Sequence, residues 1–491
     1  MDRRAFLQFL GALGLVTASG SLWPMQAGAA KPDLDVELQA IQDRLSVFPG
    51  EKTDVWRFVG KVLQGDPAQL QHLEGSWLGP IFRLRTGQRV RIRFKNRIPQ
   101  ESIVHWHGLH VGPANDGHPR LAVLPDEEYV YDFTVTNRAG TYWYHPHPHG
   151  LTGTQVYGGM AGLFVVTDEE EQALSLPAGD RDLPLVIQDR TFSPTNDLVY
   201  LRSPMERMNG FLGNKIMVNG RAEPIFDVQD RPYRLRLLNG SNSRIYRLGW
   251  SDGRNLEIIG TDGGLLESPW LVPDIMLGPG ERVDLWVDFA ESSQETPISL
   301  QSLPFNPGSG HMGMMSGPTA LPLGAAFELA RFQVRPISGR TRTSPPQRLS
   351  SIEGLDPAQA VNRETPKRFF LTMNHMQPTI NGRTFAMTEV APDEMVRLGS
   401  TEIWEFINQG SMMAMPHPMH IHGLSFQVLG RFGGPGYRFL DRGWKDTVLV
   451  MPGERVAVIM RFTDYRGLYL YHCHNLEHED LGMMRNYLVR S

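Results

Sequence analysis

Ten of the 16 histidines fall in four short clusters in which one residue separates paired histidines. The clusters are HWHG from His105, HPH from His145, HPMHIHG from His417, and HCH from His472, which His478 follows. Side chains at positions i and i+2 of a strand point to the same face, so each pair presents two imidazoles to one point. One pair is a weak signal, but four pairs in one chain predict metal binding rather than scattered surface or core histidines.

The HCH triplet predicts two metal sites that are joined through the backbone. In an extended segment Cys473 points to one face, while His472 and His474 point to the other. A thiolate ligand of one ion is then covalently linked to imidazole ligands of another. This link is a through-bond path for electrons between the two sites.

The ligand types favour copper. A blue-copper electron-transfer site uses two histidines, one thiolate and a weak thioether, and this chain offers His417, Cys473, His478 and Met483. Eight imidazoles remain, which suit three further copper ions bound by two, three and three histidines, with open positions for oxygen. Zinc is the rival metal, but structural zinc sites close at four ligands and usually hold more thiolates.

Composition excludes several other classes of protein. The 491 residues are 41% hydrophobic and 21% charged with a net charge of −5, as in ordinary globular proteins. Lys and Arg form no run outside short alternating strand patterns, so we expect no nucleic-acid partner. The single cysteine excludes an internal disulfide. At about 150 residues per domain, the length indicates roughly three domains.

Two sequence markers each occur three times and indicate three similar units. Alternating strands end at Asn96, Asn239 and Asn408, and a proline turn with an acidic residue and a strand begins at Pro125, Pro279 and Pro452. Period-2 strands between Gly and Pro turns are typical of antiparallel β-sandwiches. We therefore expect an all-β chain of three sandwiches, with residues 33–45 as the one candidate helix.

The N-terminus resembles a twin-arginine export signal. Arg3 and Arg4 precede a weakly apolar stretch at residues 11–20 and a small-residue cleavage site at residues 27–29. A membrane anchor is the alternative, but the apolar stretch is shorter than the ~20 residues that span a bilayer. We therefore expect the twin-arginine machinery to export the protein, residues 1–29 to be removed, and the product to be periplasmic without stable membrane insertion.

Together, the HWHG, WYHPH, HPMHIHG and HCHNLEHEDLGMM strings resemble the three-domain bacterial multicopper oxidases of the laccase and copper-efflux-oxidase type. The resemblance covers essentially the whole chain after the signal. It implies three cupredoxin-like Greek-key β-sandwich domains at residues 30–170, 171–335 and 367–491, with residues 336–366 as a linker. The first and third domains would hold copper, and the middle domain would be metal-free and structural.

The resemblance also implies four copper ions. The implied ligands are His417, Cys473, His478 and Met483 for type 1 copper, His105 and His420 for type 2, and His107, His145 and His474 with His147, His422 and His472 for the type 3 pair. Asp116 and Glu479 match acidic positions that the family uses to deliver the four protons consumed in reducing oxygen to water. Family spacing favours Met483 over Met484, and it leaves His149 as a solvated or nearby residue outside the ligand set.

The implied reaction takes four electrons singly from a small reductant and reduces O2 to two waters. Phenols, aromatic amines and Cu(I) all remain open as reductants. Thioethers are soft ligands that favour Cu(I), and Met312, Met314 and Met315 follow His311 in a glycine-rich loop. The copper-efflux oxidases usually carry a longer methionine-rich insertion, and an acidic residue where this chain has Ser411, so Cu(I) oxidation and a general laccase activity both stay open. A role in copper homeostasis would accompany the Cu(I) alternative.

Three other functions fit the ligand set less well. The exported cell-division protein that resembles these oxidases lacks copper ligands, whereas the set here is complete. A copper-storage or carrier protein would not need the HCH bridge. A two-domain nitrite reductase would not contain three repeats and four histidine pairs. We expect a monomeric enzyme.

Overall fold

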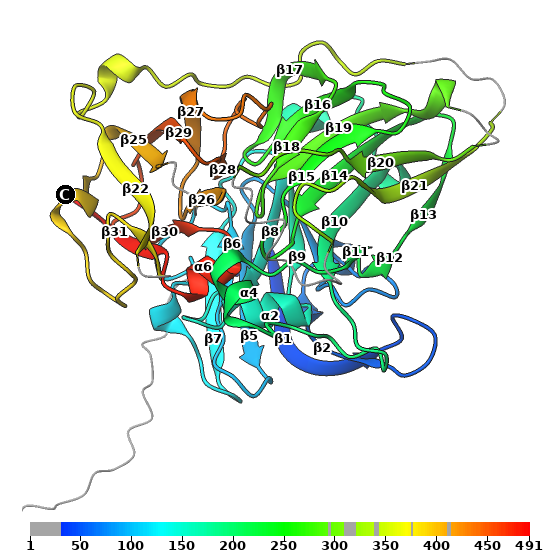
Figure 1. The fold of residues 1–491 in the computed structure, drawn as a ribbon, viewed down its shortest axis with the longest axis horizontal. Coiled ribbons are helices and arrows are strands. Elements are labelled where there is room, and N and C mark those ends of the chain that lie inside the picture. The colour runs from blue at the N-terminus through cyan, green and yellow to red at the C-terminus, as the bar shows by residue number, and fades with distance from the viewer. Residues whose placement is uncertain (1–30, 293–295, 309–320, 338–342, 375–376, 410–413) are drawn as a thin grey trace, which may run out of the picture. The chain divides into compact units, whose positions relative to one another are not determined.

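The computed structural model describes residues 31–292, 296–308, 321–337, 343–374, 377–409 and 414–491. Several sequence predictions lie outside these residues: the export signal in residues 1–29 and the roles of His311, Met312, Met314, Met315 and Ser411. Among the described residues no helix is long and apolar enough to cross a membrane. The described chain is built mainly from strands, which form six sheets (Figure 1).

The blue and cyan part of the chain forms two sheets that face each other (Figure 1). One has the order β2 (Thr53–Gln64), β1 (Leu34–Leu45), β5 (Arg89–Asn96), β7 (Glu128–Thr134); the other has β3 (Leu70–Gln71), β4 (Ile81–Arg85), β9 (Gly162–Thr167), β8 (Gly140–Pro146), β6 (Val104–His107). Ile92 of the first sheet and Phe164 of the second lie in one buried apolar cluster. The two sheets are therefore a sandwich around a common core.

The green part forms a second sandwich with one larger sheet (Figure 1). The seven-stranded sheet has the order β12 (Arg221–Ala222), β11 (Lys215–Val218), β10 (Asp182–Arg190), β14 (Pro232–Asn239), β19 (Arg282–Asp288), β16 (Leu256–Thr261), β17 (Gly264–Val272). The facing sheet has β13 (Ile225–Gln229), β21 (Phe327–Arg335), β20 (Ile298–Ser302), β15 (Tyr246–Trp250), β18 (Ile275–Leu277). Leu237 and Phe332 lie in the core between them.

The yellow-to-red part forms the third sandwich (Figure 1). Its sheets have the orders β23 (Gln377–Ile380), β22 (Lys367–Asn374), β25 (Thr401–Asn408), β29 (Glu454–Arg461), β27 (Phe426–Gly433) and β24 (Met395–Arg397), β31 (Met484–Arg490), β30 (Gly467–Cys473), β26 (His417–Ile421), β28 (Thr447–Val450). Phe406 and Tyr471 lie in the core between them. Short helices, α2 (Thr152–Gly158), α3 (Glu169–Gln172), α4 (Pro204–Asn209) and α6 (Leu476–Asp480), lie outside the sheets.

The three sandwiches share one strand arrangement, and the expected all-β fold class is confirmed. Each contains two parallel pairs at equivalent places: β1 with β5 and β4 with β9, then β10 with β14 and β13 with β21, then β22 with β25 and β24 with β31. The sheets are therefore mixed rather than purely antiparallel, because strands distant in sequence return beside one another. Among the described residues, 336–366 hold one short 3-10 helix, Pro357–Gln359, and no strand.

The candidate helix at residues 33–45 is wrong: Leu34–Leu45 is strand β1. It pairs antiparallel with β2 and parallel with β5, so both of its edges are hydrogen-bonded within the sheet. Leu34, Val36 and Leu38 alternate along the strand and are buried in the core. Leu, Glu, Gln and Ala have good helix propensity, but propensity is a weak prior that tertiary pairing overrides.

The position of β1 in the core gives a stability prediction. Leu38→Ala should lower the free energy of unfolding by about 2–5 kcal/mol, because it removes a buried side chain and leaves a cavity. Leu63→Ala on neighbouring β2, where the side chain is 49% exposed, should change it by less than about 0.5 kcal/mol. Urea unfolding of the two variants compares them directly. Equal effects would contradict the placement of β1 in the core.

Candidate metal centre

Nine of the ten clustered histidines lie on or just after paired strands in two of the sandwiches, and His478 lies on helix α6. In the first sandwich β6 pairs with β8, and the register places His105 opposite His145. In the third, β26 pairs with β30, and His420 lies opposite His472. All ten histidines are buried. In each sandwich the strand pairing therefore brings two histidine pairs together into one cluster.

Eight of these histidines, four from each of the two sandwiches, meet at one place. We call them the eight-histidine group: His105, His107, His145, His147, His420, His422, His472 and His474. The Nε2 atom of His105 lies 3.3 Å from Nε2 of His420. Nε2 of His472 lies 3.3 Å from Nε2 of His147 and 3.0 Å from Nε2 of His422. Ligand atoms of His147, His422 and His472 all lie within 4.8 Å of one another, which suits a single metal ion.

Backbone carbonyls set the orientation of several of these rings. The four Nδ1 atoms of His105, His420, His145 and His472 face the carbonyl oxygens of Asp116, Asp446, Pro146 and Cys473 at 2.6, 2.8, 2.9 and 3.1 Å. A carbonyl only accepts hydrogen bonds, so each Nδ1 must carry the proton. The lone pair is therefore on Nε2. Such contacts are typical of metal-binding histidines, because they fix the tautomer and the ring orientation.

Other ring nitrogens of the group have no partner in the described structure. Nδ1 of His107, Nε2 of His145, Nδ1 of His147 and both nitrogens of His474 are buried without a hydrogen bond. Buried polar atoms almost always have a partner, and a metal ion would provide one. Burial lowers the pKa of His145 to about 3 and of His147 to about 4, so both imidazoles are neutral. Neutral imidazole is the form that binds metal.

A second set, which we call the thiolate group, consists of His417, Cys473, His478 and Met483. The Sγ atom of Cys473 lies 3.4 Å from Nδ1 of His417 and 3.6 Å from Nδ1 of His478. Met483 and Cys473 are buried in one apolar cluster, and the Met483 carbonyl accepts the backbone N–H of Cys473. Burial raises the pKa of the Cys473 thiol, so a thiolate here requires a neighbouring cation such as a metal ion.

The HCH segment contributes residues to both groups. Cys473 belongs to the thiolate group, while His472 and His474 belong to the eight-histidine group. The side chains alternate because β30 is extended up to Cys473. Met484, the alternative to Met483, is also buried, and it lies opposite His472 in the register of β30 and β31.

The two predicted acids both contact the eight-histidine group. Oδ2 of Asp116 accepts Nδ1–H of His422 at 2.9 Å, and burial raises the pKa of Asp116 to about 8. Oε2 of Glu479 lies 3.2 Å from Nδ1 of His472, and Oε1 lies 3.6 Å from Nε2 of His147. Burial alone would raise the pKa of Glu479, but these two histidines outweigh it and lower the pKa far below its usual range.

The remaining described histidines lie outside both groups. His149 is exposed and packs against Phe385, and His72 is also exposed. His118 is buried with Nε2 2.9 Å from Oδ1 of Asn486. His110 contacts the carbonyl of Gly423 and the carboxylate of Asp464. His311 and His375 lie outside the described residues. None of these histidines was predicted to be a ligand.

Two buried acids beside the groups were missed by the sequence analysis. Asp446 has Oδ1 3.0 Å from Nε2 of His107, and its carbonyl accepts a bond from His420. No motif marks Asp446, because Arg282 and His107, which its carboxylate contacts, lie 164 and 339 positions away along the chain. Glu477 lies within the HCHNLEHED string, but only Glu479 was singled out there. The Glu477 carboxylate accepts bonds from Tyr200, Asn242, Ser243 and the backbone of Phe211.

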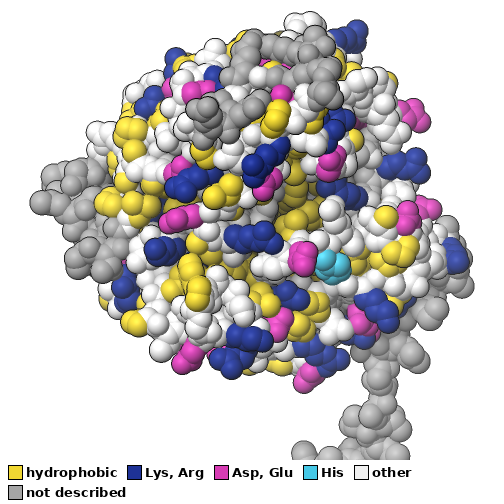
Figure 2. All heavy atoms as spheres, turned by 90° about the vertical axis from the view of Figure 1, so that its right-hand side faces the viewer, with side chains coloured by type: hydrophobic (Ala, Val, Ile, Leu, Met, Phe, Trp, Pro, Cys, Tyr) yellow, Lys and Arg dark blue, Asp and Glu magenta, His cyan; other side chains and the backbone are white. Residues whose placement is uncertain are grey.

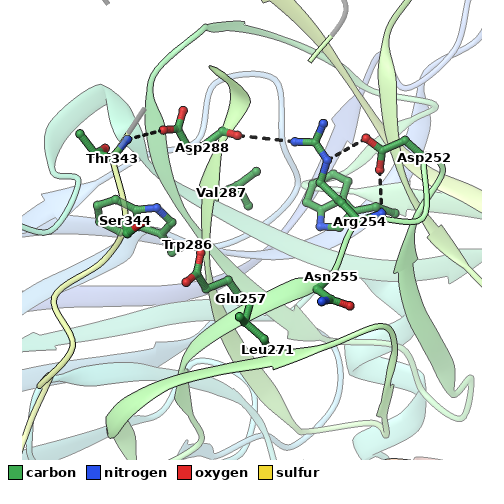
Figure 3. Close-up of a pocket in the computed structure, with 11 residues that line it drawn as sticks. Asp252, Arg254, Asn255, Glu257, Leu271, Trp286, Val287, Asp288, Thr343 and Ser344 are labelled. Atoms are coloured by element: carbon green, nitrogen blue, oxygen red, sulfur yellow. Dashed lines mark hydrogen bonds and ion pairs between the residues drawn. The ribbon is translucent and has the colours of Figure 1, made fainter. Parts of the chain in front are cut away.

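The middle sandwich also has a cavity, of about 470 Å³. Its lining contains no histidine or cysteine, and Arg254 is tied to Asp252 at 2.7 Å (Figure 3). The molecular face drawn in Figure 2 mixes Lys and Arg with acidic and apolar side chains rather than gathering them in one patch. Among the described residues, the candidate metal-binding clusters lie in the eight-histidine group, with Asp446 beside it, and in the thiolate group.

Comparison with known proteins agrees with this geometry. Family models described as multicopper oxidase match residues 59–171 and 360–491. The multicopper oxidase mco of Staphylococcus haemolyticus is 32% identical over 84% of this chain and 81% of its own length. A laccase from Bacillus stratosphericus is 30% identical over 85% of this chain and 90% of its own. The crystal structure of the multicopper oxidase McoA from Aquifex aeolicus is 39% identical, with a TM-score of 0.79 over 94% of this chain and 97% of that one.

The contacts of Glu477 predict its effect on stability. Glu477→Ala removes the common acceptor of several buried donors, and each buried donor left unsatisfied costs about 1–3 kcal/mol. We therefore expect the free energy of unfolding to fall by at least about 2 kcal/mol. Glu364→Ala is the control, because the Glu364 side chain is 83% exposed. A loss no larger than that of the control would contradict an anchoring role for Glu477.

Proposed function

Because this chain belongs to the multicopper oxidase family, we propose that it couples four one-electron oxidations at a type 1 copper to the four-electron reduction of O2 at a trinuclear copper centre. The family makes it a copper oxidoreductase. The observation that carries the finer proposal is the position of Cys473 within 3.4 and 3.6 Å of two imidazoles while its chain neighbours join the eight-histidine group. Bound copper would supply one-electron redox chemistry and the binding of O2.

The proposed ligands follow the two groups. The thiolate group would hold type 1 copper. In the eight-histidine group, the proposed ligands are His105 and His420 for type 2 copper, His107, His145 and His474 for one type 3 ion, and His147, His422 and His472 for the other. Nε2 of His107 is engaged by Asp446, so His107 would bind through its unpartnered Nδ1.

Asp116 and Glu479 are proposed to handle the four protons that accompany the four electrons, since O2, four protons and four electrons give two waters. Asp116 holds a proton at neutral pH because its pKa is about 8, and its Oδ1 has no partner. Glu479 stays ionised beside His147 and His472, because these histidines lower its pKa. At neutral pH Asp116 can therefore donate a proton, while the negative charge of Glu479 favours protonation of neighbouring groups such as His147 rather than of Glu479 itself.

The reductant is proposed to approach the thiolate group from the His417 side. Nε2 of His478 donates to the carbonyl of Met208 at 2.9 Å, so helix α4 covers that imidazole. His417 keeps 5% of its surface exposed. Phe305 and Leu323, which precede and follow Met312, Met314 and Met315 in the sequence, share a buried apolar cluster with Met415. Met415 stands two positions before His417 in the sequence. The soft thioethers of Met312, Met314 and Met315 support Cu(I) as a reductant, and the similarity to a laccase supports a general laccase activity with phenols and aromatic amines as the reductants.

We further propose the cellular context that the sequence suggests. The pair Arg3 and Arg4 and the cleavage site in residues 27–29 support export by the twin-arginine machinery to the periplasm. We propose that the exported protein acts as a monomer.

Copper content tests the proposed centre. The copper-loaded protein should hold four copper ions per chain and show an intense blue thiolate-to-Cu(II) band with type 1 and type 2 paramagnetic signals. Metal analysis, absorption and electron paramagnetic resonance measure these quantities. A folded protein that binds only zinc, or a single copper, would contradict the proposal.

Cys473→Ser provides the matched variant for this test. It should lose the blue band and nearly all oxidase activity while keeping the other copper ions, because the eight imidazoles do not depend on the thiolate. A variant that retained most of its turnover with an outer-sphere electron donor would show that electrons do not pass through Cys473.

A methionine variant separates the possible reductants. Changing Met312, Met314 and Met315 together to Ser removes soft donors but no proposed ligand. If these residues present Cu(I), the KM for Cu(I) should rise with little change in phenol turnover, as expected for the loss of uniform binding. Parallel kinetics at equal copper content measure both activities. Unchanged Cu(I) kinetics would mean that the loop does not bind the reductant.

A further inference from the structure

The middle sandwich reaches the eight-histidine group through the turn between β18 and β19. Gly280 in this turn has φ +85°, and a Cβ there would lie 3.1 Å from His474 and 3.2 Å from His107. The turn therefore packs directly against one imidazole from the first sandwich and one from the third. A sandwich without proposed copper ligands thus forms part of the wall around them.

Arg282, at the end of the same turn, is fully buried and uses all five of its N–H donors. Its Nε donates to the carbonyl of Thr141 in the first sandwich at 2.9 Å. One donor on each terminal nitrogen reaches a carbonyl of the middle sandwich, at Gly280 and Asp262. The other two donors form a bidentate pair with the carboxylate of Asp446 in the third sandwich. One guanidinium therefore joins all three sandwiches.

Asp446, which Arg282 holds, itself contacts two proposed copper ligands. Its Oδ1, 2.7 Å from the Arg282 guanidinium, is also 3.0 Å from Nε2 of His107. Its carbonyl accepts Nδ1–H of His420 at 2.8 Å. Lys445, the residue before Asp446, is also held by the middle sandwich, because its Nζ lies 2.8 Å from Asp262 and 2.9 Å from Glu281. Asp446 is thus held by the middle sandwich and itself holds one imidazole from each of the other two.

We propose that Arg282 is a positioning residue for the trinuclear centre. By fixing the Asp446 carboxylate, it holds His107 with Nε2 engaged and Nδ1 free for copper. Carboxylates that orient metal-binding histidines affect metal affinity about 10–100-fold, and Arg282 orients this carboxylate in turn. The inference rests on the proposed function, because it assumes that copper binds His107 and His420.

The alternative is that Arg282 only stabilises the contact between sandwiches. Arg234 on neighbouring β14 provides a matched control, since it is equally buried and pairs with Asp284 and Glu171. Asp284 also bonds Thr141, so this network joins two sandwiches. Arg234 contacts no proposed copper ligand among the described residues. Lysine at either position keeps the charge but cannot reproduce the planar fork of donors.

The experiment compares Arg282→Lys with Arg234→Lys and the parent after copper loading. Arg282→Lys should keep the blue band but bind trinuclear copper about 10–100-fold more weakly, with an altered type 2 paramagnetic signal. Arg234→Lys should keep the parent's affinity and signal. An Arg282→Lys protein with unchanged copper affinity and type 2 signal would overturn the inference alone. A parent that binds no trinuclear copper would overturn both the inference and the proposed function.

A double-mutant cycle with Asp446→Asn tests the route. If Arg282 acts through Asp446, Arg282→Lys in the Asp446→Asn background should cause little further loss of trinuclear copper affinity. Additive losses would contradict that route. Asp446→Asn preserves the shape of the side chain, so it serves alone if Arg282→Lys does not fold. An unchanged trinuclear copper affinity in Asp446→Asn would also overturn the inference.

Discussion

Eight buried imidazoles at the contact between two sandwiches are the constraint on which the rest of the structure depends. Burial lowers the pKa of His105, His107 and His420 and keeps these rings neutral. A neutral imidazole has one donor and one acceptor nitrogen, and both need a partner when buried. Backbone carbonyls and carboxylates satisfy one nitrogen of many rings and leave the other facing inward. The fold thus sets the direction in which these ring nitrogens point as well as the positions of the rings.

This constraint explains why charged groups cluster so deep in the molecule. Asp446, Arg282, Lys445 and Asp262 are all fully buried and bonded to one another. Taking isolated charges out of water is costly, and mutual pairing with further hydrogen bonds offsets that cost. The network lies between the sandwiches, where an apolar contact could pack but could not orient an imidazole. The buried charged network therefore lies where Asp446 can hydrogen-bond to His107 and His420.

The sequence predicted the parts of this arrangement that depend on local spacing. The alternation of His472, Cys473 and His474 follows from strand geometry, and the threefold repeat predicted the three sandwiches. Residues 33–45 were misassigned because helix-favouring side chains there lie between two partner strands. Asp446 and Arg282 could not be found, since their chemistry depends on contacts across 164 positions of the chain. Spacing reveals ligands on one strand, whereas the groups that orient them come from elsewhere in the fold.

The repeated proline turn shows how duplication of a unit can lead to different uses of one motif. The PGER sequence occurs at Pro279 and again at Pro452. In the third sandwich Gly453 is exposed, and Arg455 pairs with Glu405 with 38% of its side chain accessible. In the middle sandwich all four residues, 279–282, are buried, and Gly280 and Arg282 each contact both of the other sandwiches. One motif therefore forms an exposed turn in the third sandwich and a buried contact in the middle one, so a side chain tolerated at Gly453 would be damaging at Gly280.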